Sequence, residues 1–275
     1  MGEIVLGIGS SHAPGVTGQV EEAGEQGARF HAGLHRIREE VEKVKPDVII
    51  EIANEHFVNF YLDNMPSICV GIGEQHFGPV EPESWLHIPH RMIPGHPELA
   101  RELVKQAINS GFDLSFSEEL ALDHGTVIPL HFVTPNYDIP VIPIILNNVM
   151  EPMPNPRRVF QLGQLIRQVV ASRPKGEKVA IVGTGGVSHW VGTPEMGLIN
   201  VEFDEIFLDN IEKGKLESIA DWTNDEIGKG GNGAHEIRNW IGVMGSMPAN
   251  SKGEVATYEP IVPWVTGCAA VVWKV

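Results

Sequence analysis

The chain has 275 residues, of which 42% are hydrophobic and 20% are charged, a composition that suits one globular domain with a sizeable core. Its 36 acidic and 20 basic residues give a formal net charge of −16 at pH 7, which argues against nucleic acid and negatively charged membrane surfaces as partners. We therefore predict a single catalytic or binding domain over residues 1–275.

Only two cysteines occur, Cys69 and Cys268, and both stand in apolar stretches. This argues against a disulfide framework or a thiolate metal site and predicts two core residues. The N-terminal stretch lacks the basic region of a secretory signal, and no stretch reaches the roughly 20 apolar residues that cross a bilayer. We expect a soluble, cytoplasmic protein without a membrane partner.

The first part of the chain predicts a strand, a helix and a second strand. EIVLGIG (3–9) and PDVIIEIA (46–53) are apolar runs typical of buried strands, and the segment 20–44 between them has apolar and charged residues at helical spacing. Such a unit favours a parallel pair of strands, with ligands at their carboxyl ends. SSHAP and NEHF directly follow those two ends.

Segment 74–96 is rich in proline, contains four histidines and has no sustained period, so we predict a long loop or lid there. Beyond it, the pattern predicts the helices 96–111, 157–173, 201–211 and 216–227 and the strands 112–120, 139–149 and 178–186. A glycine-rich loop then enters a helix whose first turn holds His235 and Glu236, and PWVTGCAAVVWKV predicts a closing strand. The predicted fold class is α/β, with a central mixed, largely parallel β-sheet flanked by helices and the active site at the carboxyl ends of strands.

Four histidines lie just after an apolar run or in a predicted loop rich in Gly, Ser or Asp. They are His12, His56, His124 and His189. A single histidine in such a place is more often a hydrogen-bonded structural residue, but in an α/β fold these four positions converge on one rim of the sheet. A histidine cluster can bind a metal ion, move protons, or do both.

Two neutral imidazoles and one carboxylate suit divalent iron with open coordination positions. Glu236 is the candidate carboxylate, because the glycines before it allow close approach and the helix then holds it; alternatively, it is an acid in a first helical turn that the helix dipole stabilises. GIGSSH and GTGGVSH lack the full spacing of a phosphate-binding loop, and no G-x-S-x-G nucleophile motif occurs.

Several motifs follow one another along the chain: SSHAP, EHFVNFYLDNMPSICVG, LDHGTVIPL, GTGGVSHW with GLINVEFDEIFLD, and AHEIRNWIGVMG. In this order they resemble the class III extradiol ring-cleaving dioxygenases, and most of all the catalytic β subunit of protocatechuate 4,5-dioxygenase. The resemblance runs from the first predicted strand to beyond Met244. It implies a non-haem Fe(II) enzyme that opens the ring of a catechol with O2.

The resemblance also implies roles for the matching residues. His12, His56 and Glu236 become the iron ligands, His189 a catalytic acid or base, and His124 a second proton-transfer or hydrogen-bonding group. Protocatechuate, gallate, other catechols and aminophenols all stay open as substrates. A small α subunit helps to cover the active site in the protocatechuate enzymes, so either a separate partner exists here or segment 74–96 replaces it, in a homo- or hetero-oligomer.

Two other hypotheses compete with the dioxygenase. A non-catalytic interaction protein could keep the same fold, although it would need neither ligands nor acid–base groups. A zinc-dependent hydrolase could use the same three ligands, and activity with Zn(II) in the absence of O2 would distinguish it.

Overall fold

The four strands at the centre of the sheet run parallel to one another. In the computed structural model, which describes residues 1–275, they are β1 (Glu3–Ser10), β8 (Lys178–Thr184), β2 (Val48–Asn54) and β7 (Val141–Leu146), paired in this order. Each is an apolar run that is buried almost throughout, as strands covered on both faces must be.

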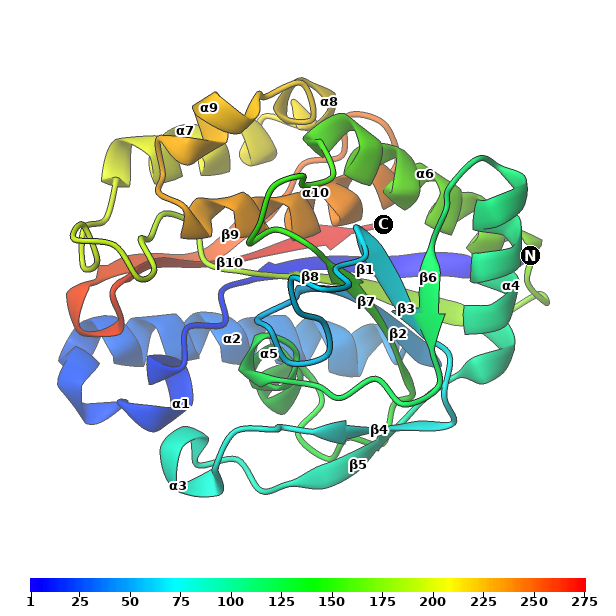
Figure 1. Cartoon of the computed structure of the whole chain (residues 1–275), viewed down its shortest axis with the longest axis horizontal. Coiled ribbons are helices and arrows are strands. Elements are labelled where there is room, and N and C mark those ends of the chain that lie inside the picture. Colours follow the sequence, from blue (N-terminus) through cyan, green and yellow to red (C-terminus); the bar gives the residue numbers. More distant parts are fainter.

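Further strands extend the sheet on both sides. β10 (Thr266–Lys274) pairs antiparallel with β1 and β9 (Glu254–Ile261), while β3 (Ile68–Gly71) pairs antiparallel with β7 and parallel with β6 (Ser115–Ser117). The order across the sheet is β6-β3-β7-β2-β8-β1-β10-β9 (Figure 1). The sheet is mixed with a parallel centre, which confirms the predicted fold class.

Helices cover both faces of this sheet (Figure 1). On one side lie α4 (Pro97–Asn109), α6 (Pro156–Ser172), α7 (Val201–Glu212) and α10 (Ile237–Ser246), and on the other lie α2 (Gly24–Val44) and α5 (His124–Val133). Because successive strand residues point to opposite faces, Ile50 of β2 packs in the core with α6 and α10, whereas its neighbour Ile49 packs with α2 and α5.

The remaining helices are short. They are α1 (Gly15–Gly18), α3 (Glu83–Leu86), α8 (Leu216–Ile219), α9 (Asn224–Gly228), and the 3-10 turns η1 (Glu21–Ala23), η2 (Gly233–Glu236) and η3 (Val262–Trp264). The predicted helix 216–227 is thus two short helices, and only three residues of the predicted strand 112–120 pair in the sheet.

Helix α5 was not predicted, and the reason lies in its sequence. HGTVIPLHFV is apolar on every side and contains Pro129, and seven of its ten residues are buried. A helix buried all round has no polar face, so no helical period marks it. His124 therefore begins a helix rather than lying in a loop.

Segment 74–96 contains more regular structure than the predicted loop. β4 (Gln75–Gly78) and β5 (Arg91–Pro94) form a two-stranded antiparallel sheet, with α3 between them. Strands of four residues are too short to show a period of two.

Cys69 and Cys268 are both free and buried, which confirms that they are core residues. None of the helices combines the length and the apolar character needed to span a lipid bilayer.

Candidate functional site

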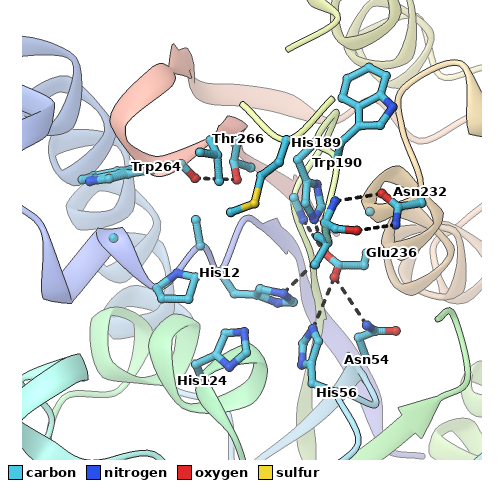
Figure 2. A pocket seen from close by; sticks show the side chains of 18 of the residues that line it. His12, Asn54, His56, His124, His189, Trp190, Asn232, Glu236, Trp264 and Thr266 are labelled. Carbon is cyan, nitrogen blue, oxygen red and sulfur yellow. Dashed lines mark hydrogen bonds and ion pairs between the residues drawn. The ribbon is translucent and has the colours of Figure 1, made fainter. Parts of the chain in front are cut away.

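All five residues singled out in the sequence line one cavity of about 680 Å³. His12 lies two residues beyond β1 and His56 two residues beyond β2, while His189 follows the end of β8. The carboxyl ends of parallel strands meet at one edge of a sheet, and this explains why residues from distant parts of the chain converge. His124 and Glu236 reach the same cavity from helix starts, at α5 and α10 (Figure 2).

The imidazoles of His12 and His56 both face the carboxylate of Glu236. The distance from His12 Nε2 to Glu236 Oε2 is 3.4 Å, and that from His56 Nε2 to Glu236 Oε1 is 3.3 Å (Figure 2). Two ligand atoms bound to one ion at roughly 2.1 Å and near a right angle stand about 3 Å apart. The three side chains therefore fit a shared divalent metal ion with little movement.

The second ring nitrogen of each of these histidines, Nδ1, lies within hydrogen-bonding distance of another side chain. His12 Nδ1 lies 3.2 Å from Thr184 Oγ1, and His56 Nδ1 lies 2.8 Å from Asp123 Oδ2. A hydrogen bond to the far nitrogen fixes the tautomer and the ring orientation of a metal-binding histidine. Asp123 is the N-cap residue of α5, but its carboxylate makes no cap hydrogen bond and faces His56 instead.

The pKa values of two buried acids, Glu51 and Asp123, are shifted in opposite directions. Burial raises the pKa of Glu51 well above its ordinary value, and the neighbouring Asp123 raises it further. Burial acts against ionisation of Asp123 too, but the charge and hydrogen bond of His56 outweigh it and lower the pKa of Asp123. Asp123 is thus the carboxylate that supports His56.

Glu236 is held as an ionised carboxylate. Burial works against its charge, but the imidazoles of His12 and His189 outweigh that effect and lower the pKa of Glu236 well below its usual value. Its oxygens also accept hydrogen bonds from Gly186 N at 2.9 Å and from Asn54 Nδ2 at 3.4 Å. An ionised carboxylate with a fixed orientation is the form that binds a metal ion.

His189 lies against glycines that leave room for its ring. A Cβ at Gly186 would stand 2.4 Å from the His189 ring, and one at Gly233 would stand 2.1 Å from His189 Nε2. Any other residue at either position would push the ring away. His189 Nε2 lies 3.7 Å from Glu236 Oε2, and its Nδ1 lies 3.4 Å from the carbonyl oxygen of Val187.

His124 stacks on His56, with ring centroids 4.5 Å apart. Its Nδ1 lies 2.6 Å from Glu81 Oε1, which also accepts a hydrogen bond from the backbone N–H of His124. Burial and then the charge on His56 lower the pKa of His124. One ring nitrogen each of His12, His56 and His124 lies within 4.8 Å of the other two, so the structure also offers a three-histidine metal site.

Three supporting acids were not identified from the sequence: Asp123, Glu81 and Asp204. Asp123 stands in the LDHGT motif, directly before His124, and this position was the one available signal. Glu81 lies in segment 74–96, for which the sequence predicts a loop or lid and no particular partner. Asp204 lies in a mixed-charge helix in which nothing in the sequence distinguishes it from its acidic neighbours.

Asp204 anchors the loop that carries His189. Its carboxylate accepts hydrogen bonds from Ser188 N, Ser188 Oγ and Tyr258 Oη, each at 2.8 Å. Burial raises the pKa of Asp204 to about 7 against the lowering effect of these bonds. Ser188 precedes His189 in the chain, so Asp204 fixes the backbone from which the histidine projects.

Replacing Asp204 with Ala should lower the free energy of unfolding by about 2–6 kcal/mol, because Ser188 N and Ser188 Oγ become buried donors without a partner and each such donor costs roughly 1–3 kcal/mol. Asp204→Asn should recover most of this loss, since its amide oxygen still accepts from Ser188 N. The raised pKa stabilises the fold in full below pH about 4, and that contribution is lost as the pH rises to about 7. The free energy of unfolding, measured with urea at several pH values, should thus decline less steeply between about pH 4 and pH 7 in Asp204→Asn than in the wild type. Equal slopes in the two proteins would contradict a raised pKa at Asp204.

Comparison with known proteins identifies the family. The family described as the catalytic LigB subunit of aromatic ring-opening dioxygenase matches residues 6–269. The chain belongs to this family. Membership confirms the predicted class III extradiol ring-cleaving dioxygenase, a class whose members depend on a metal ion.

The chain is also similar to individual members over nearly its whole length. It is 26% identical to a 2,3-dihydroxyphenylpropionate/2,3-dihydroxicinnamic acid 1,2-dioxygenase of Cupriavidus necator, with 94% of this chain and 95% of that protein covered. The enzyme of the same description from Xanthobacter autotrophicus (strain ATCC BAA-1158 / Py2) is 28% identical over the same shares.

Among solved structures, the LigB-family chain resembles the uncharacterized protein JW3007 from Escherichia coli K12. The TM-score is 0.57 at 16% sequence identity, with 86% of this chain and 91% of the other covered. At this identity the likeness supports the fold alone.

Proposed function

We propose that this chain is a non-haem Fe(II)-dependent extradiol dioxygenase that opens the ring of a catecholic aromatic compound with O2, and that residues 1–275 form one catalytic unit. The observation that carries the proposal is the convergence of His12 Nε2 and His56 Nε2 on the carboxylate of Glu236 inside the cavity. Two imidazoles and one carboxylate on one side of an ion are the donor set typical of Fe(II) oxygenases.

His12, His56 and Glu236 would hold the iron. Fe(II) held there would supply a centre that binds the catechol and O2 and passes electrons between them. Thr184 and Asp123 keep the two imidazoles oriented so that each presents Nε2 to the ion.

His189 and His124 would handle protons. If Nδ1 of His189 donates to the carbonyl of Val187, its Nε2 is left as the acceptor for a catechol hydroxyl proton. His124 has the same arrangement, with Nδ1 directed at Glu81, and a carboxylate there stabilises the imidazolium that forms when Nε2 takes a proton. We propose His189 as the base that acts when substrate binds and His124 as the second proton-transfer group.

Segment 74–96 would close the site. Trp85 of α3 lines the cavity and Glu81 binds His124, so this segment already takes part in the site. This supports the alternative in which it replaces a separate α subunit.

The proposal is tested by oxygen consumption. Protein reconstituted with Fe(II) without air should consume O2 with a panel of catechols and aminophenols and form yellow ring-opened products. Iron-loaded protein that consumes no O2 with any of them would contradict the proposal, and activity with Zn(II) in the absence of O2 would favour a hydrolase.

A further inference from the structure

The cavity contains no permanently cationic side chain that could pair with a substrate carboxylate. None of the residues that line it is Lys or Arg, and its ionisable side chains are Glu236 and four histidines. Each of these histidines already faces a carboxylate of the protein: His12, His56 and His189 face Glu236, and Nδ1 of His124 lies 2.6 Å from Glu81 Oε1. The chain as a whole carries a formal charge of −16. A second anionic group on the substrate would thus meet a negative environment.

The two buried side-chain amides of the cavity, those of Asn54 and Asn148, present acceptors rather than donors. Asn239 donates to the carbonyl of Thr184, so its Oδ1 must accept from Asn148 Nδ2, and this leaves Asn148 Oδ1 buried without a partner. Asn54 likewise donates to Glu236 and leaves its own Oδ1 without a partner. These oxygens can accept from hydroxyl groups but repel a carboxylate.

Both the oxygen and the nitrogen of the Asn232 side-chain amide are already hydrogen-bonded to the backbone. Its Oδ1 accepts from Val191 N and its Nδ2 donates to Val191 O, both at 2.8 Å, the pair of dashed lines at Asn232 in Figure 2. The Thr266 hydroxyl donates to the carbonyl of Trp264. The hydrogen-bond donors that remain on the cavity walls are neutral. An ionised carboxylate without a charged partner is strongly disfavoured in such a site.

The walls away from the metal ligands are apolar and wide. Trp85, Val191 and Met196 line the mouth and keep 47%, 56% and 58% of their surface exposed, and Trp190 and Trp264 line the interior. Grouped exposed apolar side chains at the mouth of a cavity mark a ligand-binding surface. At about 680 Å³ the cavity lies within the ~300–1,000 Å³ range of pockets for drug-sized ligands, so an unsubstituted catechol would leave much of it empty.

We propose that the substrate is a catechol whose ring substituent is uncharged, apolar and larger than a methyl group, and that this substituent lies against Trp85, Val191 and Met196. This inference rests on the proposed dioxygenase function and narrows it. It separates this chain from the relatives above, whose names denote compounds that carry a carboxylate.

Three compounds of the same skeleton test the inference. They are 3-propylcatechol, 3-(2,3-dihydroxyphenyl)propionate and its methyl ester, used with the Fe(II)-loaded full chain near neutral pH, together with the corresponding 4-substituted series. In whichever of the 3- and 4-substituted series is turned over faster, kcat/KM should be at least about tenfold higher for the propyl compound and the ester than for the acid. An acid that is turned over as efficiently as its ester would overturn the inference.

Binding gives a second readout that does not depend on turnover. Quenching of the tryptophan fluorescence of Trp85, Trp190 and Trp264 in the absence of O2 should give a Kd for the propyl compound at least about tenfold below that for the acid. If iron-loaded protein turns over none of the compounds, the proposed function fails. The order of the Kd values then still tests the preference for an uncharged ring substituent. A Kd for the acid equal to or below that for the propyl compound would overturn this preference.

A charge placed at the mouth should reverse the preference. Met196→Lys should raise the ratio of kcat/KM for the acid to that for the ester by about threefold or more, as expected for a partly exposed ion pair. Leu198→Lys adds the same charge to the same exposed loop but outside the cavity lining, and it should leave the ratio within about twofold. An equal change in both variants would assign the effect to net charge and contradict a substituent site at Met196.

Discussion

Glu236→Ala should lower the affinity for Fe(II) by more than about 100-fold, whereas His124→Ala should change it by less than about tenfold. Loss of an outer partner of a metal ligand already costs roughly 10–100-fold, and loss of a ligand costs more. The comparison decides between the two ligand sets that the structure offers, because both contain His12 and His56. Metal analysis and an Fe(II) titration in the absence of O2 measure the affinity directly, without reference to activity.

Two further variants control for folding and for charge. Glu236→Gln keeps the volume and an acceptor for Gly186 N, so a loss of metal in this variant together with an unchanged circular dichroism spectrum reports ligation rather than collapse of the site. Glu195→Ala removes an exposed carboxylate from the loop that contains Met196, and it should bind metal as the wild type does. A larger loss of affinity in His124→Ala than in Glu236→Ala would move the third ligand from the carboxylate to the third imidazole.

The central strands could be predicted because the local sequence of each is apolar throughout, which indicates a buried strand. EIVLGIG, PDVIIEIA and KVAIVGTGG are continuous apolar runs, and in α/β folds such runs end at the ligand-binding edge, so the sequence alone places His12, His56 and His189 near one another. The short strands of segment 74–96 and helix α5 carry no such signal, since the strands have only four residues each and burial removes the polar face of the helix.

The supporting residues could not be predicted, because each acts on a partner far away in the sequence. Asp123 orients His56 across 67 residues, and Asp204 holds Ser188 across 16. Nothing in the local sequence distinguishes an acid that faces a histidine from an acid that caps a helix, and Asp123 occupies the cap position while its carboxylate faces His56. For the same reason the sequence left two interpretations of Glu236, as a metal ligand or as an acid in a first helical turn. Only the positions of His12 and His56 beside its carboxylate favour the metal ligand.

His189→Gln should retain the metal and lose turnover. Its ring lines the cavity beside Glu236 but lies 3.7 Å from that carboxylate, so Fe(II) affinity should stay within about tenfold of the wild type. Positioned acid–base groups contribute roughly 10²–10⁴-fold, so kcat for the best catechol should fall by about that factor. Metal content and O2 uptake, measured on the same preparation, separate the two effects.

The comparison of His189→Gln with His124→Gln tests the division of roles between the two histidines. If His189 takes the hydroxyl proton as the catechol binds, its loss should weaken binding of the ionised catechol, seen as a smaller shift in the catechol absorbance without O2, as well as lower kcat. Loss of His124 should lower kcat while that absorbance shift stays, because Glu81 and the stacking on His56 hold His124 as a separate group. A His189→Gln variant with full turnover would remove His189 from the chemistry and leave it a residue that packs against Gly186 and Gly233.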